Sequence, residues 1–126
     1  MKRIIAAAII SGNNILIAKR NYGSLKGYWE FPGGKLEKDE TDKECICREI
    51  KEEFDVDIKV GSYLGKAKFQ VDHTKYEMSL YEANLLTKQF KLSVHEKAVW
   101  VPKTELLTYR LAPVDEVLVK QCFGGE

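Results

Sequence analysis

The sequence of 126 residues is poor in the side chains that build zinc sites and disulfides, with only three cysteines and two histidines. Cys45, Cys47 and Cys122 are odd in number and lack the spacing of paired metal ligands. His73 and His95 do not accompany them in the sequence. We therefore expect no structural zinc, and we expect a reducing compartment, the cytoplasm.

An excess of charge of either sign is also missing. Charged residues make up 31% of the chain, yet the formal net charge is only +1. Such a balance gives no strong field that would attract a polyanion. We therefore expect no binding of polymeric nucleic acid through bulk charge.

Long hydrophobic runs are absent. The apolar segment over residues 2–10 is too short to span a bilayer, and a polar turn over residues 11–14 follows it. No small-residue cleavage site marks it as a signal peptide, and its removal would delete what looks like the first core strand. We expect no membrane association. Repeats and linkers are missing as well, and the length suits a single domain over residues 1–126.

What is present is a series of apolar segments separated by turn signals. The expected strands form two hairpins and one further short strand, and they cover residues 2–10, 15–20, 56–71, 75–86 and 98–101. The expected helices cover residues 42–54, 102–107 and 113–123. Between them, the stretch that begins at Pro32 contains two glycines, which predicts a loop.

The helix over residues 42–54 has a clear start signal. Thr41 followed three residues later by Glu44 forms a capping box, and Asp42 lies in the first turn, where the helix dipole favours an acid. Apolar residues recur every four positions and predict a buried stripe of Ile46, Ile50 and Phe54, with Cys47 alongside.

The closing helix begins at a proline, a residue that suits the first turn of a helix. Pro113 occupies that position. The side chains expected to face the core are Val114, Val117, Leu118 and Phe123.

Three carboxylates gather on one side of the first helix. Glu49, Glu52 and Glu53 fall within an arc of roughly 100°. Like charges one turn apart cost a few tenths of a kcal/mol, so a solvated acidic face is one interpretation. The other is a metal and diphosphate site, because carboxylates are hard ligands that suit Mg²⁺ or Mn²⁺ and because the preceding glycine pair exposes main-chain groups.

The spacing of these residues resembles the Nudix box. From Gly34 the chain runs five residues to Glu40 and seven more to Arg48 and Glu49, and then an aliphatic residue, one further residue and two glutamates follow. The departure is Asp55, where the box has glycine. Asp tolerates the left-handed backbone conformation better than most residues, so the change is expected to be mild.

The resemblance extends beyond the box. The short chain, the stretch "WEFPGGK" and the late "LAPVDEVL" are similar to MutT-like nucleotide pyrophosphohydrolases, especially those that act on CTP and modified cytidine nucleotides. It implies an α/β/α sandwich in which a mixed sheet lies between the box helix and the C-terminal helix. It also implies hydrolysis of a nucleoside triphosphate, (d)CTP or an oxidised or methylated nucleotide, to the monophosphate and pyrophosphate, in sanitation of the nucleotide pool.

Two alternatives stay open. One is hydrolysis of a nucleoside diphosphate linked to another group, such as ADP-ribose or a dinucleoside polyphosphate. The other is a catalytically silent nucleotide-binding module, against which the three intact glutamates argue. Neither the box nor the composition distinguishes a monomer from a homodimer.

The resemblance also implies roles for individual residues. The metal ligands expected from it are Gly33, through its carbonyl oxygen, and Glu49, Glu52 and Glu53, which would hold Mg²⁺ or Mn²⁺. Arg48 would orient a carboxylate, and Glu40 would support the loop. Glu53 or Glu52 is the first candidate for accepting the proton of the attacking water, and Glu96 is the alternative general base.

Substrate contacts are expected at both ends of the nucleotide. Arg20 would contact phosphate or base, and Lys35 would help to neutralise the phosphates, although cations at strand ends and in loops are often simply exposed. Asp115 would accept from an exocyclic amino group such as that of cytosine, although the helix dipole alone favours an acid there. Phe31 and Trp29 would stack on the base, unless they belong to the core.

Overall fold

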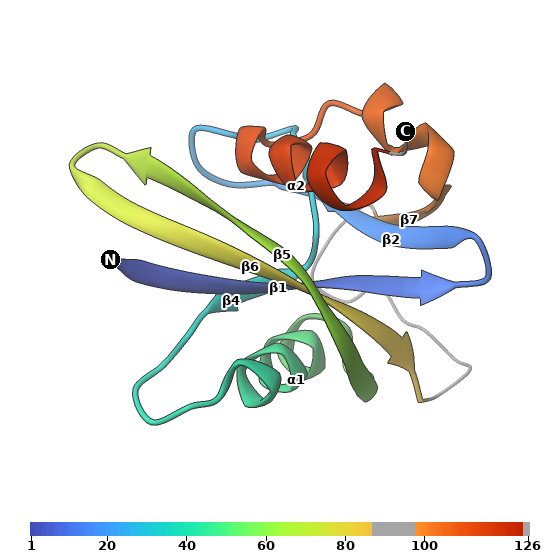
Figure 1. The fold of residues 1–126 in the computed structure, drawn as a ribbon, viewed down its shortest axis with the longest axis horizontal. Coiled ribbons are helices and arrows are strands. Elements are labelled where there is room, and N and C mark those ends of the chain that lie inside the picture. Colours follow the sequence, from blue (N-terminus) through green and yellow to red (C-terminus); the bar gives the residue numbers. More distant parts are fainter. Residues whose placement is uncertain (87–97, 125–126) are drawn as a thin grey trace.

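The computed structural model describes residues 1–86 and 98–124, and within these a mixed sheet lies between two helices (Figure 1). The strands are β1 (Lys2–Ser11), β2 (Asn14–Lys19), β3 (Trp29–Glu30), β4 (Gly33–Lys35), β5 (Ile58–Val71), β6 (Thr74–Leu85) and β7 (Ala98–Pro102). The helices are α1 (Asp42–Phe54), a 3₁₀ helix η1 (Lys103–Thr108) and α2 (Pro113–Phe123). The expected α/β/α sandwich is confirmed.

Strand β1 organises the sheet. It pairs in parallel with β6 along one side, and β6 pairs with β5 in a long antiparallel hairpin. Along its other side, β1 pairs antiparallel with β4 in its first half and with β2 at its end. Strand β2 then carries β3 and β7. Both predicted hairpins and the short strand near residue 98 are confirmed.

The sheet separates two hydrophobic cores. Because successive strand residues point to opposite faces, β1 contributes to both. Ile5 and Ile9 lie in the core that α1 covers, whereas Ala6 and Ala8 lie in the core that α2 covers. This two-sided burial explains why the first strand is apolar throughout rather than alternating.

The first helix has the predicted bounds and the predicted cap. The Glu44 amide donates to the Thr41 hydroxyl at 3.1 Å, and the Thr41 amide donates to the Glu44 carboxylate at 2.9 Å. At the other end, Asp55 adopts the left-handed conformation with φ 55° and ψ 40°. The box position that lacks its glycine therefore keeps the backbone conformation that a glycine would take.

The prediction of burial is wrong for one residue of the stripe on α1. Cys47 is exposed, and Cys45 is fully buried instead. The reason is β4, which lies against the start of α1 and places the carbonyl oxygens of Gly34 and Lys35 within 3.8 and 3.5 Å of the Cys45 sulfur.

Two further predictions are corrected. The loop expected from Pro32 includes the short strand β4, because Gly33–Lys35 adds to β1 by main-chain pairing that needs no side-chain pattern. In α2, Val117 is 52% exposed, and Val119 is buried together with Leu118. The helix therefore turns a slightly different face to the sheet than the apolar residues alone predict.

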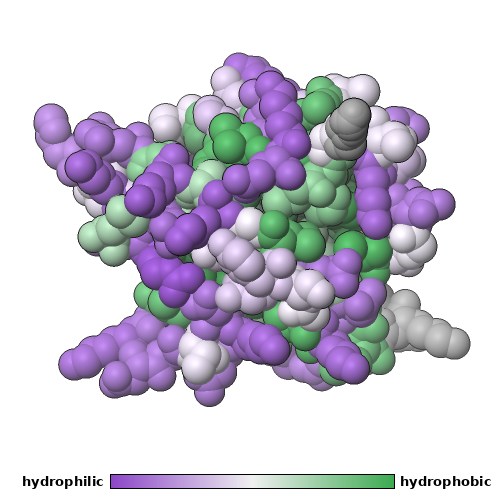
Figure 2. All heavy atoms as spheres, in the orientation of Figure 1, coloured by the Kyte–Doolittle hydropathy of each residue, from purple (hydrophilic) through white to green (hydrophobic). Residues whose placement is uncertain are grey.

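The surface is mixed in character. Hydrophilic side chains cover much of the face in Figure 2, and hydrophobic ones emerge between them. In the part of the chain that the structure describes, no helix has the length and apolar character needed to cross a membrane.

Candidate active site

Strand β4 brings the glycine pair against the acidic face of α1. The α-carbon of Gly34 lies directly over the carboxylate of Glu49, and a β-carbon at this position would overlap the carboxylate carbon. Only glycine lets the strand and the acid approach so closely. Gly34 thus leaves the space that the carboxylate of Glu49 occupies.

Gly33 turns its main-chain groups toward the acids. The neighbouring Ala7 amide donates a ladder hydrogen bond of 2.9 Å to the Pro32 carbonyl. Bonded and non-bonded pairs alternate along an antiparallel ladder, so the pair of Ala6 and Gly33 is a non-bonded one. The Gly33 amide and carbonyl therefore point away from β1, and the amide hydrogen-bonds to the carboxylate of Glu53.

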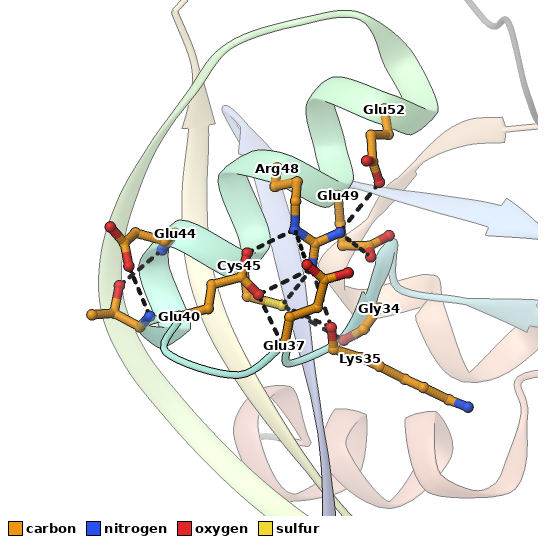
Figure 3. Close-up of polar contacts among 10 residues, drawn as sticks. Gly34, Lys35, Glu37, Glu40, Glu44, Cys45, Arg48, Glu49 and Glu52 are labelled. Carbon is orange, nitrogen blue, oxygen red and sulfur yellow. Dashed lines mark hydrogen bonds and ion pairs between the residues drawn. The ribbon is translucent and has the colours of Figure 1, made fainter.

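Arg48 lies at the centre of a network of carboxylates (Figure 3). Its guanidinium donates to both oxygens of Glu40, at 2.7 and 3.0 Å, to Glu49 at 2.8 Å and to Glu52 at 3.3 Å. It also donates to the Lys35 carbonyl at 3.2 Å. One cation thereby ties the loop before α1 to two of the acids on the helix.

The contacts with Arg48 and the burial of the acids shift the pKa values of three glutamates. Hydrogen bonds from Arg48 lower the pKa of Glu40 to about 2. Burial raises the pKa of Glu49, and the bond from Arg48 opposes that change. Burial, followed by the charges of Glu49 and Glu30, raises the pKa of Glu53 to about 8. The site therefore holds more negative charge than its single arginine balances.

This donor set fits a divalent cation in part. Within residues 1–86 and 98–124, no three His, Cys, Asp or Glu side chains are gathered closely enough to hold a metal ion. Glu49, Glu53 and the Gly33 carbonyl supply hard oxygen atoms at one place, as Mg²⁺ prefers. The side chain of Glu52 is 61% exposed and is paired with Arg48. It would have to turn away from Arg48 to join the other ligands of a metal ion.

A cavity of about 700 Å³ opens beside these acids. Its size lies in the range of small-molecule sites. Most of the site residues predicted from the sequence line it, namely Arg20, Phe31, Gly33, Lys35, Glu49, Glu53 and Asp115. Arg48, Glu52 and Trp29 are not part of its wall, while Glu96 lies outside the described residues.

Asp115 contributes to the cavity wall from α2, on the face of the sheet opposite to α1 (Figure 1). It lies in the first turn of α2, is 2% exposed and accepts a 2.9 Å hydrogen bond from the Phe31 amide through Oδ2. Burial raises its pKa to about 7, although the bond from Phe31 opposes the change. Its carboxyl group can therefore accept or donate a hydrogen bond near neutral pH.

The two predicted stacking residues are both packed within the fold. Phe31 is 3% exposed, and its ring lies 6.4 Å from that of Phe123. Trp29 packs edge to face on Tyr109, with ring centroids 5.4 Å apart. Of the two, Phe31 alone reaches the cavity wall.

The structure adds residues that the sequence did not suggest. Glu30 on β3 lines the cavity, and its carboxylate forms an ion pair with Arg20. Aromatic and apolar side chains also line the cavity, among them Tyr22, Leu25, Phe69 and Met78. The sequence signal for Glu30 was an acid between two aromatic residues in "WEF", but its partner, Arg20, directly follows another strand, β2.

Comparison with known proteins agrees with this geometry. The sequence model of the NUDIX domain matches residues 1–122. The CTP pyrophosphohydrolase of Escherichia coli K12 is 31% identical over 121 residues, covering 95% of this chain and 90% of its own. A Mycobacterium tuberculosis protein named putative 8-oxo-dGTP diphosphatase 2 is 31% identical over 116 residues, covering 89% and 81%. The solution structure of the E. coli ORF135 protein superposes with a TM-score of 0.84 at 30% identity, covering 96% of this chain and 87% of that one.

Proposed function

We propose that this chain, which belongs to the NUDIX family and is a Nudix hydrolase, splits CTP, dCTP or their oxidised or methylated forms into the nucleoside monophosphate and pyrophosphate. One observation carries the choice of a nucleotide. One cavity is lined both by the acids Glu49 and Glu53 of α1 and by Asp115 of α2, two helices on opposite faces of the sheet (Figure 1). A nucleoside triphosphate has the matching polarity, with anionic phosphates at one end and hydrogen-bonding groups on its base at the other.

At the acidic end, Glu49, Glu53 and the Gly33 carbonyl would hold Mg²⁺ or Mn²⁺, and Glu52 would join them after turning from Arg48. The chemistry that such an ion supplies when bound is polarisation of phosphate oxygens and a lower pKa for a coordinated water. Arg48 keeps Glu49 and the loop in place through its bonds to Glu49 and Glu40.

Proton transfer in this proposal belongs to Glu53. Its carboxylate lines the cavity, where it would face the attacking water. Glu52 and Glu96 are the alternative acceptors from the sequence. At the phosphates, Lys35 lines the same end of the cavity and supplies a cation.

At the other end, Asp115 would bind the amino group of cytosine through its carboxylate. Its Oδ2 is held by the Phe31 amide, which fixes how the carboxyl group would face the base. The apolar wall residues Phe31 and Met78 would contact the base plane.

The proposal extends to the setting of the reaction. The cysteines among the described residues are all free, which supports a reducing compartment such as the cytoplasm. We further propose that residues 1–126 form one domain whose ligand is a free nucleotide rather than a polymeric nucleic acid, and whose role is sanitation of the nucleotide pool.

The test is pyrophosphate release from a panel of ribo- and deoxyribonucleoside triphosphates, including 5-methyl-dCTP and 8-oxo-dGTP, with and without Mg²⁺. We expect metal-dependent release that favours cytidine nucleotides and falls at least about 100-fold in Glu53→Gln. Glu116→Gln, on the exposed side of α2, is the control and should retain activity. Release from ADP-ribose or a dinucleoside polyphosphate alone would instead support the linked diphosphates, and a folded protein silent on every compound would contradict the enzyme.

A further inference from the structure

The ion pair between Arg20 and Glu30 leaves one carboxylate oxygen unused. The Nε and Nη2 atoms of Arg20 donate to the same oxygen, Oε1, at 3.1 and 2.5 Å. The second oxygen of Glu30 accepts no hydrogen bond from any residue that the structure describes. The side chain is only 14% exposed and lines the cavity. A largely buried acceptor without a partner is costly unless something else donates to it.

The carboxylate of Glu30 is near acids of both helices that line the cavity, Glu53 of α1 and Asp115 of α2. The segment of residues 30–33 runs along the wall, with the Phe31 amide on Asp115 and the Gly33 amide on Glu53. The charge of Glu30 raises the pKa of Glu53 and also that of Asp115, so its carboxylate is close enough to act on both. Glu30 thus lines the same cavity as Glu53 and Asp115 and is within electrostatic reach of both.

Arg20 makes this acid compatible with an anionic ligand. Its guanidinium balances the charge of Glu30 and is held in place by the ring of Tyr22, 5.1 Å from the centroid. A neutralised carboxylate does not repel phosphates as a free one would, yet it keeps its capacity to accept a hydrogen bond. The pair therefore suits a neutral hydroxyl donor.

We propose that Glu30 reads the sugar of the nucleotide, with its free oxygen accepting a hydrogen bond from a sugar hydroxyl. The inference rests on the proposed function, because it takes the phosphates to lie at Glu49 and Glu53 and the base at Asp115. In every nucleotide the sugar connects these two parts, and Glu30 is the acid of the cavity wall that is near both of them. The residue is then a determinant of sugar specificity in addition to the predicted contacts with metal, phosphate and base.

The experiment compares kcat/KM for CTP, 2′-deoxy-CTP, 3′-deoxy-CTP and 2′,3′-dideoxy-CTP at saturating Mg²⁺. A hydrogen bond to a charged acceptor corresponds to about a 10-fold or larger effect. We expect the wild-type protein to lose at least that factor when the hydroxyl that Glu30 binds is removed, and the two single-deoxy compounds show which hydroxyl it is. The comparison within the wild-type protein does not depend on the folding of any variant.

Variants then assign the effect to Glu30. In Glu30→Gln, whose amide is a weaker acceptor, the loss caused by removing the hydroxyl should shrink to less than about 3-fold. Glu30→Asp is the second variant, since it keeps the charge for Arg20 but withdraws the oxygen, and the same reduction is expected. The matched control is Glu77→Gln, because Glu77 is 13% exposed and paired with Arg3 but does not line the cavity.

The outcomes separate the two claims. Wild-type hydrolysis that is indifferent to both hydroxyls would overturn the assignment of Glu30 while the proposed function stands. So would a hydroxyl effect that persists in both Glu30 variants, or a change in base preference alone. Absence of metal-dependent hydrolysis of every triphosphate would overturn the proposed function itself, and the sugar assignment with it.

Discussion

The Phe31 amide donates a 2.9 Å hydrogen bond to Asp115, although the two residues lie 84 positions apart in the chain. This bond joins the end of β3 to the first turn of α2 and holds a carboxyl group that is 2% exposed. The amide donors of Phe31 and of Asp115 itself do not compensate fully for burial, and the pKa of Asp115 rises to about 7.

The raised pKa of Asp115 predicts a specific dependence of stability on pH. The folded state keeps this proton up to about pH 7, whereas the unfolded state loses it near pH 3.9. The contribution of Asp115 to the free energy of unfolding therefore falls as pH rises from about 4 to 7, by an amount on the order of 4 kcal/mol, and stays constant above. Asp115→Asn should remove this component, so urea denaturation at pH 5 and 8 should show the variant gaining stability relative to wild type at pH 8. A difference in free energy of unfolding between variant and wild type that is the same at both pH values would contradict the prediction.

Gly34→Ala should weaken the acidic site without unfolding the protein. The added methyl group meets the carboxylate of Glu49, which must move from its place. We expect the Mg²⁺ concentration for half-maximal activity to rise at least about 10-fold, because ligand position controls affinity for this ion. Gly61→Ala is the matched control, since its β-carbon would lie 3.4 Å from the nearest atom of Glu82. Equal metal dependence in both variants would argue against a placing role for Gly34.

The bonds between Arg48 and Glu40 predict a loss of stability in acid. The pKa of Glu40 is lowered to about 2, so its stabilising contribution is present above about pH 4.5 and is lost as pH falls toward 2. Glu40→Gln should lower the melting temperature at pH 7, and its difference from wild type should vanish near pH 2. Glu116→Gln, with a side chain that is 50% exposed, should show little difference at either pH.

Asp55 offers a test of backbone strain at the end of α1. A left-handed conformation is unfavourable for residues with a β-carbon, and Asp tolerates it only partly. Asp55→Gly should raise the free energy of unfolding by up to about 1 kcal/mol, despite losing a 3.5 Å ion pair with Lys51 on the surface. Asp55→Ala should lower it by a similar amount, which denaturant titration would detect. A stabilising alanine would show that the cap does not strain this residue.

The sequence by itself determined the features that depend on neighbouring residues. The bounds of α1, its capping box and the left-handed Asp55 follow from short-range hydrogen bonds and backbone preferences, and all are present in the fold. The spacing of Glu49 and Glu53 on one helix face follows from helix geometry in the same way. The metal roles of these acids remain predictions, although both line one cavity.

Only the tertiary structure decided the features that depend on distant partners. Strand β4 exists because β1 pairs with it, and its position is what buries Cys45 instead of Cys47. The pairing of Arg20 with Glu30 likewise requires β2 and β3 to lie side by side. The physical reason is that local patterns specify helices and caps through contacts a few residues apart. Sheet edges, ion pairs between strands and buried carboxyl groups arise only when the chain brings remote segments together.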